Sequence, residues 1–114
     1  LAANLARVLP VGVVADVDRS GWVVPPVFDL VRRLGSVPWD DLEGTLNLGV
    51  GMVAVVDPEW ADAVLGVAQA ADIPAWVLGG VHEAQSYGPR GRLVGGTKGV
   101  DGGAVDVFGS YRTA

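Results

Sequence analysis

Two short polar stretches of this sequence carry groups that could bind an anion. One is Asp18-Arg19-Ser20, and the other is Asn47-Leu48-Gly49, which continues to Gly51. An arginine guanidinium and the backbone N–H groups of a loop are common ligands of phosphate oxygens. If the strands next to these loops are neighbours in the sheet, the two stretches form one anion-binding site. The candidate site residues are Arg19, Ser20, Asn47, Gly49 and Gly51.

A purely structural role for the same residues is an open alternative. Arg19 could form an ion pair with Asp16 or Asp18 instead of contacting a ligand. The glycines of Asn47-x-Gly49-x-Gly51 could serve only a turn and a site of close packing, because glycine accepts positive φ and has no Cβ. Short glycine motifs alone do not decide between these roles.

Composition excludes several other kinds of chemistry. The 114 residues include no cysteine and one histidine, His82, so disulfides, thiolate catalysis and a multi-histidine metal site are excluded within this chain. His82 is expected at the surface or in a structural role. The sequence contains neither a GxxxxGK[ST] phosphate loop nor a GxGxxG motif, and no nucleophile elbow.

Charge and hydropathy narrow the possible partners. Residues 1–84 carry 4 basic and 11 acidic side chains, whereas residues 85–114 carry 4 basic and 2 acidic ones. An acidic chain without a basic stripe is not expected to bind nucleic acid. No apolar run approaches the roughly 20 residues that span a bilayer, and no signal peptide is recognisable, so a cytoplasmic protein without membrane contact is predicted.

The elements that must position the two polar loops follow from the apolar pattern. Apolar residues at helical spacing predict helices, and short valine-rich runs predict strands. The predicted helices cover residues 1–9, 25–35, 39–46 and 57–72; the second is expected to end at Gly35 as its C-terminal glycine cap. The predicted strands cover residues 11–17, 50–56, 75–81 and 92–94. We expect an α/β (α+β) fold, a mixed sheet covered by helices, with residues 50–56 as the central strand and 92–94 at an edge.

The two ends of the sequence have their own features. A helix that starts at residue 1 without a cap suggests that the sequence is cut from something longer. Eight of the 17 glycines fall within the last 30 residues, and glycine-rich polar sequence buries little apolar surface. We therefore expect a folded domain over residues 1–95 and a flexible, glycine-rich tail over residues 96–114.

Four segments, taken in order, resemble one enzyme family. Residues 18–28, Asp-Arg-Ser-Gly-Trp-Val-Val-Pro-Pro-Val-Phe, are similar to a characteristic segment of phosphoribosylformylglycinamidine cyclo-ligase, the aminoimidazole ribonucleotide (AIR) synthetase. Residues 47–52, Asn-Leu-Gly-Val-Gly-Met, resemble its Asn-Met-Gly-Ile-Gly-Met. Residues 4–10 resemble the helix after its His-x-Thr-Gly-Gly-Gly loop, and residues 76–79 resemble the strand after its last long helix. One departure is Val23, where the family has a proline.

The resemblance implies a fold and a function. It covers the C-terminal domain of the family, which is partly ferredoxin-like, and implies an N-terminal ATP-binding domain in the same polypeptide, which dimerises. The parent enzyme would use ATP and Mg²⁺ to close the imidazole ring of formylglycinamidine ribonucleotide, giving aminoimidazole ribonucleotide in purine biosynthesis.

Within that enzyme this chain would form one wall of the ribonucleotide cleft. It would be inactive alone and would bind neither ATP nor metal by itself. The implied roles are Arg19 toward a phosphate, and Asn47 with the backbone of Gly49 and Gly51 toward substrate oxygens. Alternatives are a domain of another ATP-dependent enzyme of the same superfamily, or a stand-alone binding module without catalysis.

Overall fold

The computed structural model describes residues 1–95 and 102–114 and contains four α-helices, three short 3₁₀ helices and six strands in that part of the chain. The α-helices are α1 (Ala2–Val8), α2 (Pro26–Gly35), α3 (Trp39–Thr45) and α4 (Ala61–Ala70). The 3₁₀ helices are η1 (Arg19–Gly21), η2 (Pro58–Trp60) and η3 (Ala84–Ser86). The strands are β1 (Val13–Asp18), β2 (Val23–Val24), β3 (Val81–Glu83), β4 (Arg92–Gly95), β5 (Ala104–Phe108) and β6 (Arg112–Thr113).

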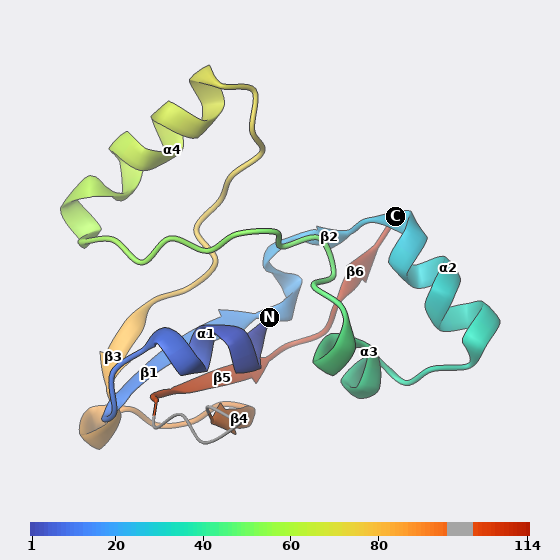
Figure 1. The fold of residues 1–114 in the computed structure, drawn as a ribbon, viewed down its shortest axis with the longest axis horizontal. Helices are drawn as coiled ribbons and strands as arrows, with labels where there is room; N and C mark the ends of the chain where they lie inside the picture. Colours follow the sequence, from blue (N-terminus) through green and yellow to red (C-terminus); the bar gives the residue numbers. More distant parts are fainter. Residues whose placement is uncertain (96–101) are drawn as a thin grey trace.

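A mixed four-stranded sheet forms the centre of the fold, with the strand order β3-β1-β5-β4 (Figure 1). β1 and β5 are parallel, while the two edge strands β3 and β4 pair antiparallel with them. β2 follows β1 in the chain and β6 follows β5, and these two short strands form a separate parallel pair. The expected α+β class with a mixed sheet is therefore confirmed.

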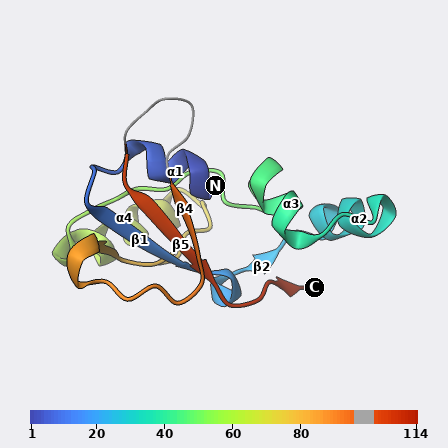
Figure 2. The same cartoon turned by 90° about the horizontal axis from the view of Figure 1, so that it is seen from below.

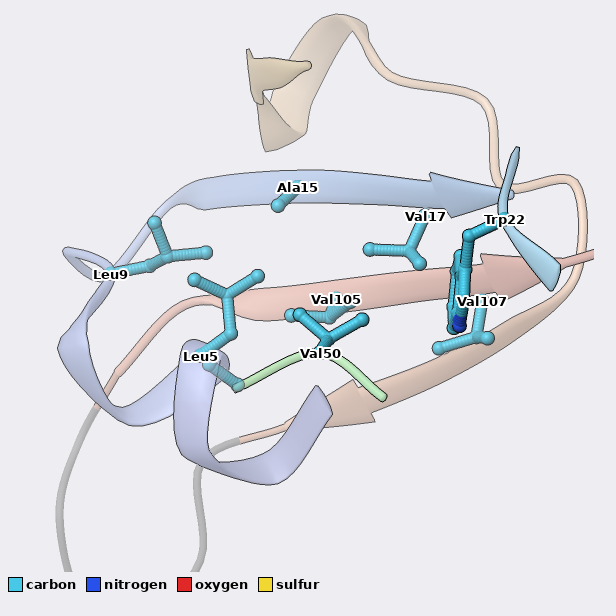
Figure 3. Close-up of a cluster of buried hydrophobic side chains, with 9 residues drawn as sticks. Leu5, Leu9, Ala15, Val17, Trp22, Val50, Val105 and Val107 are labelled. Atoms are coloured by element: carbon cyan, nitrogen blue, oxygen red, sulfur yellow. The ribbon is translucent and has the colours of Figure 1, made fainter. Parts of the chain in front are cut away.

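The main core lies between this sheet and α1, which packs across β5 and β4 (Figures 1 and 2). Parallel pairing in register places Ala15 beside Val105 and Val17 beside Val107. These four side chains are buried, and residues of α1, the loop after it and the Asn47 loop close over them (Figure 3). The other members of this core are Leu5, Ala6, Leu9, Trp22 and Val50.

A second, smaller core supports α3 and the loop after it. Val24, Leu42 and Leu48 are buried there, and Trp39 and Tyr111 pack against them. Tyr111 also meets Trp22 edge to face, with 5.7 Å between the ring centroids. The C-terminal segment therefore contacts both cores, which joins α3 and its loop to the sheet.

The expectation of a flexible tail over residues 96–114 is wrong for residues 102–114. β5 is an interior strand of the sheet, and Val105 and Asp106 are fully buried. Glycine content suggested a loose tail, yet the apolar alternation at Val105 and Val107 supplies a buried strand face. Residues 96–101, the remainder of that prediction, lie outside the described residues.

The two predicted strands on either side of α4 are wrong as well. No strand is assigned over residues 51–57 or 73–80. Of the strand predicted over residues 75–81, only Val81 lies in a strand, where it begins β3. Their valine-rich sequences favour extended backbone, but a strand also needs a neighbouring edge with which to pair. Val53, Trp76 and Leu78 pack against the main core, whereas Met52 is 90% exposed.

The other sequence-based predictions agree with the structure within a few residues. The four helices, β1 and the edge strand β4 lie where the pattern placed them. The cap of α2 differs, because Ser36, with φ of 52°, takes the left-handed position expected of Gly35. No described helix has the length and apolar character needed to cross a membrane.

Candidate functional site

Arg19 opens the short η1 helix directly after β1, where Asp18 caps the turn. The backbone N–H and the hydroxyl of Ser20 both donate hydrogen bonds to Asp18 Oδ1, each at 2.8 Å. An aspartate with this capping role is typical of the start of a helical turn. The carboxylate of Asp18 is therefore used by the loop itself, and Ser20 is held against it.

The guanidinium of Arg19 binds Glu43 of α3 in a two-pronged ion pair. Arg19 Nε and Nη2 lie 2.9 Å and 2.8 Å from the two carboxylate oxygens of Glu43. Arg19 Nη1 also donates to the carbonyls of Val107 and Gly109. The expected structural alternative, a pair with Asp16 or Asp18, is corrected by this geometry: the partner comes from α3.

Glu43 is the centre of a half-buried polar cluster. Besides Arg19 it accepts a hydrogen bond from the hydroxyl of Tyr111 at 2.5 Å. Burial opposes ionisation of Glu43, but the hydrogen bonds from Arg19 and Tyr111 and the charges of Arg19 and Arg92 outweigh it and lower its pKa. Burial and the bond to Glu43 raise the pKa of Tyr111, so its hydroxyl keeps its proton and donates. These contacts tie η1, α3 and the C-terminal segment together.

The Asn47 loop is a tight turn with little freedom. Asn47 Oδ1 accepts the N–H of Gly49 at 3.0 Å, and the carbonyl of Asn47 accepts the N–H of Val50 at 3.1 Å. Leu48 and Gly49 have φ of 53° and 100°. Asparagine and glycine favour such turns, because the amide bonds the nearby backbone and glycine accepts positive φ without strain.

The two polar loops pack against each other through Trp22, although residues 51–56 do not form the neighbouring strand on which the expectation depended. Trp22 Nε1 donates to the carbonyl of Leu48 at 2.9 Å in a buried position. A Cβ on Gly49 would lie 2.6 Å from Pro25 Cδ, so only glycine fits there. Gly49 therefore has the structural role given above as an alternative, because it is required for the turn and for close packing against Pro25.

A groove of about 350 Å³ lies between α1 and the segment after the Asn47 loop. Asn4, Leu5 and Val8 of α1 face Asn47 and residues 50–53 across it. The structure thus brings Asn47 and Gly51 together in one groove, whose lining does not include Arg19, Ser20 or Gly49. Among the described residues, the lining holds two side-chain amides and no acidic, basic or histidine side chain, so it is suited to binding rather than to proton transfer.

Sequence reasoning missed a second polar cluster on the opposite face of the sheet. Asp16 accepts bonds from the N–H of Gly80 at 2.7 Å, from His82 Nε2 at 2.8 Å and from Arg90 Nη2 at 2.8 Å. Burial opposes ionisation of Asp16, but these hydrogen bonds and the charges of His82 and Arg90 lower its pKa. The available signal in the sequence was Asp16 itself, a charged residue inside the predicted strand over residues 11–17.

Asp106 of β5 belongs to the same cluster and is fully buried. It accepts the backbone N–H groups of Arg90 at 2.8 Å and Gly91 at 2.9 Å, and the hydroxyl of Tyr87. Burial opposes its ionisation, but these bonds and the charge of Arg90 lower the pKa of Asp106. Among the described residues no group of three or more histidine, aspartate or glutamate side chains could hold a metal ion.

Comparison with known proteins gives a consistent family over most of the chain. Residues 1–91 match the family described as AIR synthase related protein, C-terminal domain. A protein of Streptomyces fradiae with the name phosphoribosylformylglycinamidine cyclo-ligase is 48% identical over 94 residues, which cover 82% of this chain and 52% of that protein. The cyclo-ligases of Symbiobacterium thermophilum and Nitrosospira multiformis are 47% and 36% identical over 90 residues, covering 79% of this chain and 26% of each relative.

The chain thus spans about half the length of the first relative and about a quarter of the other two. No solved structure matches it.

Proposed function

The chain belongs to the AIR synthase related protein family, as its C-terminal domain, and from this we propose that it forms one wall of the substrate cleft of an ATP-dependent cyclo-ligase. The names of its relatives support the reaction class. In the proposed reaction the formyl oxygen of formylglycinamidine ribonucleotide is phosphorylated by ATP. An amine nitrogen of the substrate then attacks that carbon, phosphate leaves, and the imidazole ring of aminoimidazole ribonucleotide is closed.

The groove beside α1 is the observation that carries the proposal. Two segments that resemble the cyclo-ligase, residues 4–10 and 47–52, face each other across it. Its apolar residues can pack against the uncharged parts of a ribonucleotide, while the amides of Asn4 and Asn47 can bond its hydroxyl or amide groups. We assign Asn47 and the backbone of Gly51 to the substrate, with Gly49 shaping the turn.

Arg19 and Ser20 are proposed as residues that position the site. Arg19 already donates to Glu43 and to two carbonyls, which leaves little of its hydrogen-bonding capacity for a phosphate. Ser20 is bonded to Asp18. Their contribution is to hold α3, and with it the Asn47 loop, against the sheet.

We propose that this chain does not itself hold ATP or Mg²⁺. The described part has no candidate metal cluster, and the sequence has no phosphate loop. We therefore assign nucleotide and metal to an N-terminal ATP-binding domain of the same polypeptide, and expect this chain alone to be inactive. Dimerisation through that domain and a cytoplasmic location belong to the same proposal.

The decisive variant is Asn47→Asp in the full polypeptide that contains this chain. Aspartate keeps the oxygen that accepts the Gly49 N–H, so the turn remains, but it replaces the amide donor with a negative charge. We expect kcat/KM for ATP-dependent ring closure to fall roughly ten- to hundredfold, with a melting temperature close to that of the unchanged protein. Asp57→Asn, at an exposed position away from the groove, is the control. Unchanged kcat/KM in Asn47→Asp would refute the assignment of Asn47.

Arg19→Ala distinguishes a positioning role from phosphate binding. Loss of the pair with Glu43 should lower the melting temperature clearly, and Lys at position 19 should restore part of it. If Arg19 binds a phosphate instead, kcat/KM would fall while the melting temperature stays unchanged. Absence of ring-closure activity in the intact full-length polypeptide would overturn the proposed reaction itself.

A further inference from the structure

Residues 102–114 lie beyond the part of the chain that matches the family, yet they supply an interior strand of its sheet. The family match ends at residue 91. β5 pairs with β1 on one side and with β4 on the other, and β6 continues beside β2 (Figure 1). The segment therefore fills the groove, one strand wide, between β1 of the family portion and β4, which follows the family match at residues 92–95.

The apolar side chains of β5 fit that groove on the face toward α1. Val105 is fully buried and Val107 is 5% exposed, and both point into the main core (Figure 3). Their neighbours on β1 are Ala15 and Val17, which are in register with them. A polar residue at either position would place an unpaired polar group inside the core.

The opposite face of the groove contacts one charged residue of the segment. Asp106 receives two backbone N–H groups, from Arg90 and Gly91, and the hydroxyl of Tyr87. Backbone N–H groups aimed at a buried carboxylate form strong, charge-assisted bonds. Asparagine has one acceptor oxygen and an N–H₂ group in place of the two carboxylate oxygens, so one of these donors would lose its acceptor. The groove therefore favours aspartate.

Glycines at both ends of the segment are required by close contacts. A Cβ on Gly102 would collide with the carbonyl oxygen of Ala6, and one on Gly103 with that of Val13. Gly109 has φ of 74°, and a Cβ there would collide with the carboxylate of Asp18. Side chains or glycines are thus specified at six of the eight positions from Gly102 to Gly109.

We propose that the groove between β1 and β4 is a strand-binding site, and that its ligand is the chain's own segment Gly102–Gly109, with the pattern Gly-Gly-x-Val-Asp-Val-x-Gly. The segment is a separable module that completes the sheet by main-chain pairing on both sides, as an added strand does in peptide recognition by strand addition. Recognition is sequence-specific through Asp106 and the two valines. The proposal does not depend on the cyclo-ligase reaction.

The test uses the full chain after cleavage at a single site. A protease site replaces residues 96–101, and the purified protein is cleaved so that both pieces are retained. The cut protein is unfolded in denaturant with a tenfold excess of a fluorescent peptide of residues 102–114, and is then refolded by dilution. We expect the labelled peptide to occupy most of the refolded protein and to co-elute with it.

Variant peptides measure the specificity. A peptide with Asp106→Asn should compete roughly ten- to hundredfold more weakly, and one with Val105→Asp should not compete at all. A peptide with Thr113→Ala, at an exposed position, should compete like the unchanged peptide. Refolding of residues 1–95 with the same stability whether or not a peptide is bound would overturn the proposal, and so would equal competition by the Asp106→Asn peptide.

Discussion

Asp16 of β1 and Asp106 of β5 are register partners on adjacent parallel strands, so two carboxylates lie side by side on one face of the sheet. Arg90 contacts both: its guanidinium lies 2.8 Å from Asp16, and its backbone N–H donates to Asp106. The guanidinium also lies over the ring of Phe108, 4.1 Å from its centroid. One residue thus offsets the repulsion between two like charges and fixes the segment between β3 and β4 over them.

Replacement of the buried carboxylate should destabilise the fold. Asp106→Asn keeps the shape of the side chain but removes the charge that two N–H groups and a hydroxyl meet. We expect the free energy of unfolding to fall by about 1–3 kcal/mol, the cost of mismatched buried hydrogen bonds. Chemical denaturation measures the change. Asp62→Asn, at an exposed position on α4, is the matched control and should stay within about 0.5 kcal/mol. Equal effects of the two substitutions would contradict this account of Asp106.

Stability should decrease toward acid pH. The pKa values of Asp16, Glu43 and Asp106 are lowered in the folded protein, so the unfolded chain binds more protons at acidic pH. Their stabilisation is complete above the unfolded pKa values of about 4, and it is lost as the pH falls through the lower folded values.

Denaturation at a series of pH values between about 7 and 3 should therefore show a free energy of unfolding that declines below about pH 5. Asp106→Asn should show a shallower decline, because one of the three groups no longer titrates. A decline with the same slope in that variant would show that Asp106 does not contribute.

The two glycines of the Asn47 loop should respond differently to alanine. Gly49→Ala places a Cβ at positive φ and against Pro25, so we expect a loss of at least about 1–2 kcal/mol in the free energy of unfolding. Gly51 has no atom within 4 Å of the position of a Cβ, so Gly51→Ala should be nearly neutral for stability. Similar losses for both would mean that the turn is not the reason for glycine at position 49.

Hydrogen exchange should divide the chain into two parts. Amides of β1 and β5 are paired inside the sheet and should exchange only through global unfolding. Residues 51–56 and 74–78 have no strand pairing, and α4 buries none of its residues, so amides there should exchange orders of magnitude faster. Mass spectrometry of peptic fragments gives both rates. Equal protection of residues 51–78 and of β1 would show that these segments are paired in solution.

The sequence predicted the helices well and the strands of the sheet poorly. Helical spacing located all four helices, because an amphipathic stripe is a property of neighbouring residues. Val50–Val56 also has the composition of a strand, but whether a strand forms depends on an edge supplied from elsewhere. β5 shows the converse: it is interior to the sheet although its many neighbouring glycines suggested a tail.

The candidate site was also predicted only in part. The sequence predicted that the loops around Arg19 and Asn47 meet if the strands beside them are neighbours, and the loops do pack through Trp22 and Leu48 although residues 51–56 form no strand. It could not indicate that Glu43, 24 residues further along the chain, would occupy the guanidinium of Arg19. Such a pairing depends on where α3 docks, which no local pattern contains.

The pairing of β1 with β5 also sets the order in which the protein can be assembled during synthesis. Val14 pairs with Ala104, so β1 and the four described α-helices are all synthesised before β5, the parallel partner of β1. Closing so long a loop slows the formation of this pair, because the entropy of closure must be lost before the contacts form. Completion of the sheet is therefore expected to wait until β5 has been synthesised, and the pairing of β5 is the step that commits this part of the chain to the native state.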